Sequence, residues 1–222
     1  MKIISWNIGN FIYAKCFPGR KHYCFHVPDM RKVSQMIKKE NADIVFLQEI
    51  MNEDIDFVIQ NFTEFRYNMK IRSDDRLSKS IFLSKYEIQE IHHTNSNDYI
   101  INDITFFPIH LNAFSPKKRY EQAKLLVKDL PSKKGVILGD TNFWIFKSNF
   151  ISDRDKKSYN KILENHIDIL KKLGHTCRIF LSLDKIFITK DLKHFDEKIV
   201  RHKISQIDHF MIVSNIENEN KN

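Results

Sequence analysis

The chain contains little glycine, proline or cysteine. Only 5 of its 222 residues are glycine and 5 are proline, whereas glycine alone usually makes up about 7% of a protein. Flexible glycine-rich linkers are therefore not expected, and no change in composition marks a boundary between domains. We predict a single domain over residues 1–217 and a polar tail over residues 218–222.

The three cysteines, Cys16, Cys24 and Cys177, form an odd set without a CxxC pair. This pattern favours reduced thiols over a disulfide framework. No apolar run approaches the roughly 18 residues of a membrane-spanning helix, and the first residues, MKIISWNIGNF, lack the pattern of a signal peptide. We therefore expect a cytoplasmic or other reducing intracellular compartment.

Positive charge is in surplus, with 36 lysines and arginines against 28 acidic residues and a net charge of +8. Such a surplus favours polyanionic partners, which include nucleic acid and the headgroups of anionic lipids. The basic residues occur in scattered pairs and not in one run, so a purely solubilising role for them is the alternative.

Hydrophobic patterns predict strands and amphipathic helices in one continuous series. Helices are expected after Pro28-Asp29, from Ser115-Pro116 to just before Pro131, and over residues 158–174. Short apolar runs predict strands at residues 2–8, 42–49, 79–85, 104–114, 135–140, 182–189 and 208–216. This order favours two sheets packed face to face with helices outside.

One of these strands ends in an unusual way. The stretch ILGDTNFW, residues 137–144, runs from apolar residues into Asp140 and Asn142. Both residue types are common in turns. The alternative is a site at the rim of a sheet, with both side chains pointing the same way because they alternate along an extended backbone.

Similar polar residues interrupt or end most of the predicted strands. Unpaired polar groups cost a few kcal/mol each when buried, so a recurring set suggests side chains that converge and satisfy one another around a bound ion. The set comprises Asn7, Glu49, His110, Asn112, Asp140, Asn142, Asp184, Asp208 and His209.

The residue types in this set point to a particular chemistry. Carboxylates and amides are hard oxygen ligands that suit Mg²⁺ or Mn²⁺ better than Zn²⁺. Histidines beside such an ion donate to phosphate oxygens or move protons, which phosphate-ester hydrolysis requires. The sequence contains neither a GxSxG nucleophile motif nor a GxxxxGK[ST] phosphate loop.

The ordered motifs SWNIG, DIVFLQE, IHLNA, VILGDTN, LDKIF and IDHF resemble those of the endonuclease/exonuclease/phosphatase superfamily. The resemblance extends from Lys2 to about Ile216. It implies the DNase-I-like fold, a four-layered α/β sandwich with its site at one end of two packed mixed sheets.

The resemblance also implies a metal site and an attacking water. Glu49 would be the principal Mg²⁺ ligand, with Asn7 and Asp208 near the same ion. Asp140 would activate or align the water, and Asn142 would assist it and contact the substrate.

The histidines would act on the phosphate. His209 would contact the scissile phosphate and be oriented by Asp184. His110 would face it from the other side, and Asn112 would be a further substrate-binding residue.

Two features depart from the pattern of the superfamily. Its last motif usually reads Ser-Asp-His, but Ile207 stands in the serine position here. The loop over residues 9–27 is long and mixes basic with aromatic residues. It would either grip a nucleic-acid strand or fold onto the sheet through its own aromatics.

Several substrates fit the resemblance. We expect a phosphodiesterase or nuclease acting on DNA, with tyrosyl-DNA phosphodiesterase-like or endonuclease activity. The alternatives are a phosphatase of a phosphorylated lipid or small molecule and a catalytically silent binding module. The apolar stretch NFWIFKSNFI, residues 142–151, is interpreted as a short core strand, with a wedge beside the substrate or a membrane-touching tip as alternatives.

Overall fold

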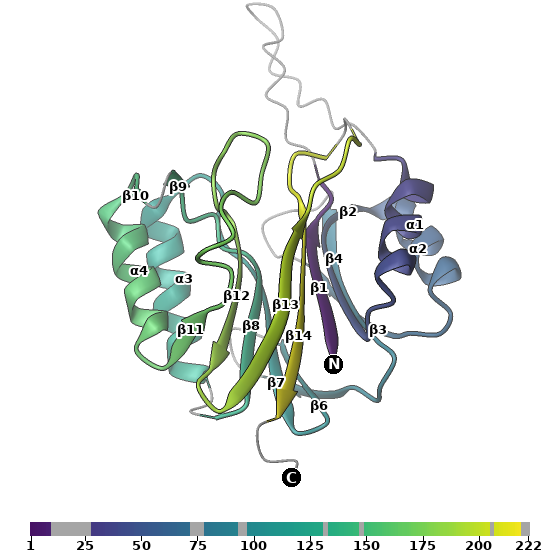
Figure 1. Cartoon of the computed structure of the whole chain (residues 1–222), viewed down its shortest axis with the longest axis horizontal. Coiled ribbons are helices and arrows are strands. Elements are labelled where there is room, and N and C mark those ends of the chain that lie inside the picture. The colour runs from purple at the N-terminus through teal and green to yellow at the C-terminus, as the bar shows by residue number, and fades with distance from the viewer. Residues whose placement is uncertain are drawn as a thin grey trace, which may run out of the picture.

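Two six-stranded mixed sheets pack face to face, and helices cover the outer face of each (Figure 1). This computed structural model describes residues 1–9, 28–71, 78–92, 97–130, 133–146, 149–204 and 207–218. The predicted four-layered α/β sandwich is confirmed. The predicted grip or packing of loop 9–27 concerns residues that lie, apart from Gly9, outside the described ranges.

The first sheet has the strand order β13-β14-β1-β2-β4-β3. Its strands are β1 (Lys2–Asn7), β2 (Ile44–Met51), β3 (Arg66–Ile71), β4 (Ser78–Ser84), β13 (Leu192–Val200) and β14 (Met211–Asn218). On its outer side lie the helices α1 (Met30–Glu40) and α2 (Ile55–Asn61). A short 3-10 helix, η1 (Asn52–Asp54), directly precedes α2.

The second sheet has the strand order β11-β12-β8-β7-β6-β5. Its strands are β5 (Gln89–His92), β6 (Asn97–Ile101), β7 (Ile104–His110), β8 (Gly135–Asp140), β11 (His166–Asp168) and β12 (Asp184–Thr189). Its outer side carries α3 (Pro116–Asp129), α4 (Asp153–Leu163) and a two-stranded ribbon, β9 (Ile145–Phe146) with β10 (Asn149–Phe150).

Strand direction brings the polar strand ends together. β1 runs parallel to β2, and β7 runs parallel to β8. β14 and β12 are antiparallel to their neighbours β1 and β8, so they begin where those strands end. The predicted site residues therefore collect at one end of the sandwich, the upper end in Figure 1.

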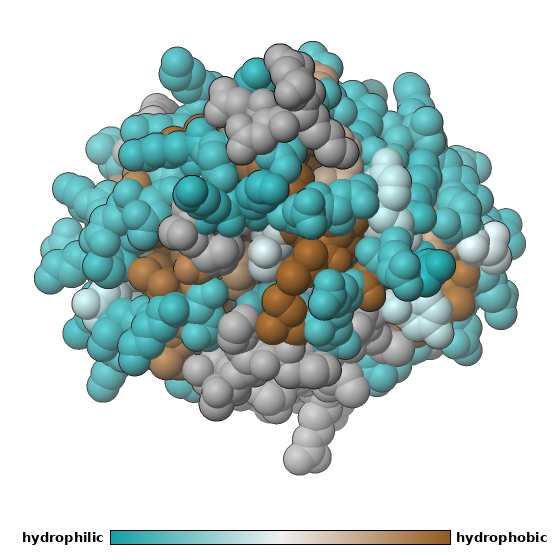
Figure 2. Space-filling view, turned by 90° about the horizontal axis from the view of Figure 1, so that it is seen from below, coloured by the Kyte–Doolittle hydropathy of each residue, from teal (hydrophilic) through white to brown (hydrophobic). Residues whose placement is uncertain are grey.

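The opposite end of the sandwich carries mainly hydrophilic residues around a smaller hydrophobic area (Figure 2). Among the described residues, no helix is long and apolar enough to cross a membrane.

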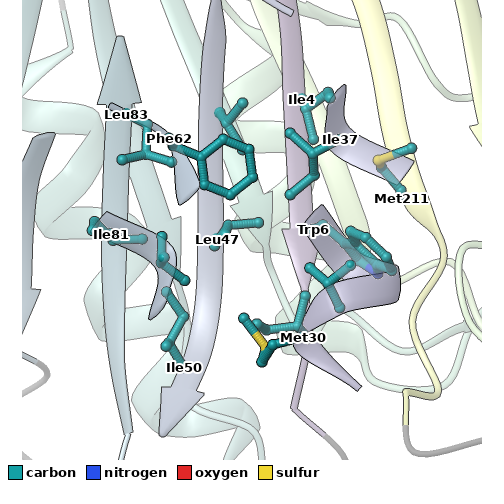
Figure 3. Packing of buried hydrophobic residues seen from close by; sticks show 14 of the residues in the cluster. Ile4, Trp6, Met30, Ile37, Leu47, Ile50, Phe62, Ile81, Leu83 and Met211 are labelled. Carbon is teal, nitrogen blue, oxygen red and sulfur yellow. The ribbon is translucent and has the colours of Figure 1, made fainter. Parts of the chain in front are cut away.

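Three apolar clusters hold the layers together. β2 shows how they are linked, because it is buried on both faces and its residues are almost all apolar. Val45 and Leu47 pack under α1 and α2 with Trp6 and Phe62. Figure 3 shows Leu47, Trp6 and Phe62 of this cluster. Phe46 packs between the two sheets. A third cluster lies beneath α3 and α4.

Two helix starts agree with the capping signals of the sequence. Asp29 accepts hydrogen bonds from the first amides of α1, and Ser115 accepts one from the amide of Lys118 in α3. α3 ends at Asp129, before Pro131 as predicted.

The helix predicted over residues 158–174 exists, but both of its predicted bounds are wrong. α4 instead begins at Asp153, capped by the Ser152 hydroxyl, and ends at Leu163. The chain then forms β11, which pairs with β12. Pairing at the free edge of the sheet therefore outcompetes the continuation of the helix.

The predicted core strand over residues 142–151 is also wrong. The stretch forms the β9–β10 ribbon outside both main sheets. Phe143 and Ile145 are buried, whereas Trp144 and Ile151 are 42% and 61% exposed. Phe143 and Ile145 therefore reach the core cluster beneath α3 and α4, whereas Trp144 and Ile151 face outward.

A buried ion pair joins α3 and α4. Arg119 donates from Nε and Nη2 to the carboxylate of Asp155 at 2.8 and 2.7 Å. Its Nη1 donates to the carbonyls of Asn112 and Ala113, in the loop that follows β7. The pair therefore fixes the loop that leaves the site end of the second sheet.

We predict that Asp155→Ala lowers the free energy of unfolding by about 3–5 kcal/mol, because it leaves the Arg119 charge buried without its partner. Chemical denaturation measures the change. Glu121→Ala, which removes an exposed ion pair with Lys124, is the matched control and should change stability by less than about 1 kcal/mol. Equal effects of the two variants would contradict a structural role for the buried pair.

Candidate active site

The site lies where the two sheets meet at their upper end. Asn7 ends β1 and Glu49 lies in β2, both in the first sheet. His110 ends β7, Asp140 ends β8 and Asp184 begins β12, all in the second sheet. Asp208 and His209 lie just before β14, and Asn112 and Asn142 lie just after β7 and β8.

Asn7 connects the carboxylates of the two sheets. Its Nδ2 donates to Glu49 Oε1 and to Asp140 Oδ2, each at 3.1 Å. Its Oδ1 accepts a hydrogen bond from the amide of Gly9 at 3.0 Å. A Cβ atom at Gly9 would lie 1.9 Å from Glu49 Oε2, so only glycine allows the chain to pass this carboxylate.

A β-bulge places Glu49 in the site. The pairing of β2 with β4 shifts between Leu47 and Ile50, and both of these side chains pack beneath the helices. Strict alternation would put residues three apart on opposite faces. Glu49 therefore occupies the extra position with a φ of 59°, a strained conformation of the kind that persists at functional sites.

Gln48 is a site residue that the sequence analysis missed. Its Oε1 accepts a hydrogen bond from the amide of Asp140 at 2.8 Å, and its Nε2 donates to the hydroxyl of Ser5 at 3.0 Å. The side chain is fully buried and links the first sheet directly to the strand that carries Asp140. A second polar residue, directly before Glu49 in a largely apolar strand, was the available signal.

The two histidines both approach the same oxygen of Asp140. His110 Nε2 is 3.8 Å from Asp140 Oδ2 and 3.2 Å from Glu49 Oε1. His209 Nε2 is 3.8 Å from the same Asp140 oxygen and 3.9 Å from Asp208 Oδ1. Both rings can therefore donate into the space between the carboxylates.

Asp184 orients His209. His209 Nδ1 lies 2.9 Å from Asp184 Oδ2, within hydrogen-bond distance. Burial of the ring would lower the pKa of His209, but the carboxylates of Asp184 and Asp140 outweigh this effect and raise the pKa well above its usual value. The two carboxylates therefore favour the protonated, imidazolium form of His209 in the metal-free protein.

The main chain of His209 is also fixed. Its carbonyl accepts hydrogen bonds from Trp6 Nε1 at 3.0 Å and from His202 Nε2 at 2.8 Å. Ile207, which replaces the usual serine of the superfamily, is fully buried among apolar side chains. Local support at this motif therefore comes from core packing and from the two donors on the His209 carbonyl.

Asp208 lies next to the negative charge of Glu49. Burial has the largest effect on Asp208 and raises its pKa. The positive charge of His209 lowers this pKa and the negative charge of Glu49 raises it, so that the net shift is upward. Its backbone carbonyl accepts from the amide of Arg178 at 2.7 Å. The side chain remains partly exposed and accessible from solvent.

Asp140 and Asn142 do not alternate along an extended strand. β8 ends at Asp140, and Asn142 has a φ of 50°, in the left-handed region. The amide of Asn142 donates to Asp140 Oδ1 at 2.7 Å, and its side-chain Nδ2 donates to the carbonyl of Leu111 at 3.1 Å. The stretch is therefore both a turn and part of the site.

Asn112 has a structural role in the free protein. Its Oδ1 accepts from the amides of Phe114 and Ser115 at 3.1 and 2.8 Å, and its own amide donates to Gln122 Oε1. These bonds shape the turn that leads into α3. A direct contact between Asn112 and substrate would use the side-chain Nδ2, because Oδ1 and the backbone amide already form these hydrogen bonds.

Comparison with known proteins identifies the fold and the family. Residues 4–205 match the sequence model of the Endonuclease/Exonuclease/phosphatase family. The chain belongs to this family. Its members are hydrolases that act on phosphoesters and depend on divalent metal ions. A search of curated proteins gives no match.

Solved structures of this family superimpose over nearly the whole chain. A 3′ phosphatase from Neisseria bound to a product DNA hairpin is 15% identical, with a TM-score of 0.73 and coverage of 98% and 99% of the two chains. An AP endonuclease from Archaeoglobus fulgidus is 16% identical, with a TM-score of 0.71 and the same coverage. A mannosyl-6-phosphatase from Bacteroides thetaiotaomicron is 15% identical, with a TM-score of 0.68 and coverage of 98% and 99%.

Two groups of side chains could hold a divalent metal in this family member. Ligand atoms of Asp140, Asp184 and His209 lie within 4.8 Å of one another. In that group Asp184 engages Nδ1 of the imidazole and, with Asp140, raises the pKa of His209, so a metal there would have to displace the proton on Nε2. The second group, Glu49 with Asp208, consists of carboxylates that repel one another and therefore suits a cation better.

We predict that Gln48→Leu lowers the free energy of unfolding by about 1–3 kcal/mol, because the buried amide of Asp140 loses its acceptor. Chemical denaturation tests this, with Gln60→Leu on the exposed face of α2 as the matched control. Unchanged stability in Gln48→Leu would show that the bond between the sheets contributes little.

We predict that His209 stays protonated as the pH rises past the usual histidine pKa of about 6.5. Because its folded-state pKa is raised, its charge stabilises the fold below about pH 6.5, and this contribution is lost as the pH rises through the raised value. NMR titration of the ring nitrogens in metal-free protein measures it, and the His209→Asn spectrum assigns the signal. A measured pKa of His209 at or below about 6.5 would contradict the prediction that this histidine stays protonated.

Proposed function

We propose that the chain is a divalent-metal-dependent phosphodiesterase that cleaves nucleic acid, with DNA as the favoured substrate. The observation that carries the proposal is the convergence of four carboxylates and two histidines, from both sheets, at one end of the sandwich. The net charge of +8 supports a polyanionic substrate.

Mg²⁺ or Mn²⁺ would be held by Glu49 and Asp208, with the Asn7 amide beside them. These hard oxygen donors match the preference of both ions, and a cation there relieves the repulsion between the carboxylates. When bound, the ion supplies positive charge that neutralises the scissile phosphate.

Asp140 would accept the proton of the attacking water. Burial, the largest influence on this group, raises the pKa of Asp140, which makes its carboxylate a stronger base than an exposed aspartate. The backbone amide of Asn142 fixes one carboxylate oxygen at 2.7 Å. The Asn142 side chain would help to align the water and contact the substrate.

The histidines would stabilise charge on the phosphate. His209, oriented by Asp184, would donate from Nε2 to a non-bridging oxygen. His110 would donate from the opposite side, to the phosphate or to the leaving oxygen. Asn112 would bind substrate at the edge of this space.

We predict that Glu49→Gln lowers turnover with Mg²⁺ by at least about 100-fold, because a neutral amide replaces the main anionic ligand. Thermal unfolding gives a second readout: Mg²⁺ should raise the melting temperature of the wild type by mass action and leave that of the variant unchanged. Glu121→Gln, an exposed change on α3, is the matched control. Normal turnover in Glu49→Gln would refute the ligand assignment.

The substrate class is tested by a panel with Mg²⁺ that contains DNA, RNA, a 5′-phosphotyrosyl oligonucleotide, phosphoinositides and a sugar phosphate. We expect DNA to be hydrolysed best, with an affinity that falls steeply from low to physiological salt. Faster hydrolysis of a phosphoinositide or sugar phosphate, with a flat salt dependence, would favour the phosphatase alternative. Hydrolysis of no phosphoester would leave a binding module.

A further inference from the structure

A hollow that shares no residue with the candidate active site lies on the outer face of the second sheet. It is a pocket of about 690 Å³ between the β9–β10 ribbon, α4 and the segment 171–185. In Figure 1 the ribbon lies toward the upper end of the sandwich, the end that carries the site, and α4 lies below it on the outer side. None of the proposed catalytic residues lines this pocket.

The pocket combines aromatic walls with a polar floor. Phe150, Tyr159 and Phe180 contribute rings. On the floor, the buried Lys185 lies 3.2 Å from Asp168 and donates to Ser182 at 2.9 Å. Because Asp168 neutralises this lysine, the floor suits a flat group with hydrogen-bonding atoms and no charge.

Phe180 lines this pocket in an unfavourable backbone conformation. Its φ is 62°, in the left-handed region, and its side chain is 62% exposed. A bulky residue is strained there, whereas glycine or asparagine would fit. Because the ring is mostly exposed, its burial contributes little free energy to offset the backbone strain. The strain therefore suggests that the ring contacts a ligand.

The turn that carries Phe180 is fixed to the catalytic residues. The Arg178 amide donates to the Asp208 carbonyl, and the Phe210 amide donates to the Thr176 carbonyl, each at 2.7 Å. Cys177 forms a β-bridge with His209. A group bound against Phe180 is therefore held in a set position relative to the proposed site of phosphate cleavage.

We infer that this pocket is a subsite for a nucleobase of the substrate, with Phe180 as the stacking ring; the inference rests on the proposed function. A base has a π-face for the aromatic walls and polar edges for Ser182, Asn160 and the floor. The exposed Lys171 at the pocket adds positive charge for a neighbouring phosphate.

The inference is tested by a double-mutant-type cycle that removes the Phe180 ring from the protein, the nucleobases from the substrate, or both. Wild type and Phe180→Gly are compared by kcat/KM, with Mg²⁺, on a single-stranded thymidine oligonucleotide and on the same backbone with abasic spacers. Stacking on one ring corresponds to roughly tenfold or more. We expect Phe180→Gly to lose about tenfold on the thymidine substrate and less than about twofold on the abasic one.

Stability separates this role from a structural one. Phe180→Gly removes the strain and should keep or raise the melting temperature, while Phe180→Trp should retain activity on thymidine substrate. Phe195→Ala, which removes a ring that is 40% exposed on β13, is the control and should affect neither substrate.

The outcomes distinguish the two proposals. If both oligonucleotides are cleaved and Phe180→Gly lowers both rates equally, or neither, the subsite is wrong and the phosphodiesterase stands. If neither oligonucleotide is cleaved while a phosphoinositide or sugar phosphate is, both proposals fall.

Discussion

Confinement of negative charge at the junction of the two sheets is the constraint on which the site depends. Glu49, Asp140, Asp184 and Asp208 all lie at one end of the sandwich, and all but Asp208 are buried. Carboxylates so placed repel one another unless cations or hydrogen-bond donors lie between them. The His209 imidazolium lies between Asp184 and Asp140, and the amide of Asn7 lies between Asp140 and Glu49. Among the described residues, no such cation or donor has been identified between Glu49 and Asp208. A divalent cation bound there would therefore neutralise the most negative charge.

The same constraint explains why the site needs the whole fold. Asn7 and Gln48 belong to the first sheet, and each hydrogen-bonds to Asp140 of the second. The apolar layer between the sheets, which includes Phe46 and Phe106, sets the separation at which these bonds form. The geometry of the site therefore depends on how the core packs. A change in the packing of the two sheets would change the distances between the carboxylates.

The sequence predicted the elements whose signals are local and the site residues whose positions are strand ends. Capping at Asp29 and Ser115 located two helices, and the ordered polar interruptions identified the residues that converge. Three kinds of feature were not predictable. The apolar spacing after Ser158 fits one helical face and equally fits a short helix followed by β11, so only pairing with β12 decides between them. Edge strands such as β5 and β13 carry too many polar residues to stand out. The bulge at Glu49 and the link through Gln48 depend on partners far along the chain, on β4 and β8.

The central claim is that one hydrated divalent cation is bound by Glu49 and Asp208 and not by the hydrogen-bonded group of Asp184 and His209. Anomalous X-ray scattering from crystals grown with Mn²⁺ locates the ion directly. We expect a single strong peak at coordination distance, about 2.2 Å, from carboxylate oxygens of Glu49 and Asp208. A peak coordinated by Asp184 and the His209 ring instead, or the absence of any peak at this end of the sandwich, would contradict the account.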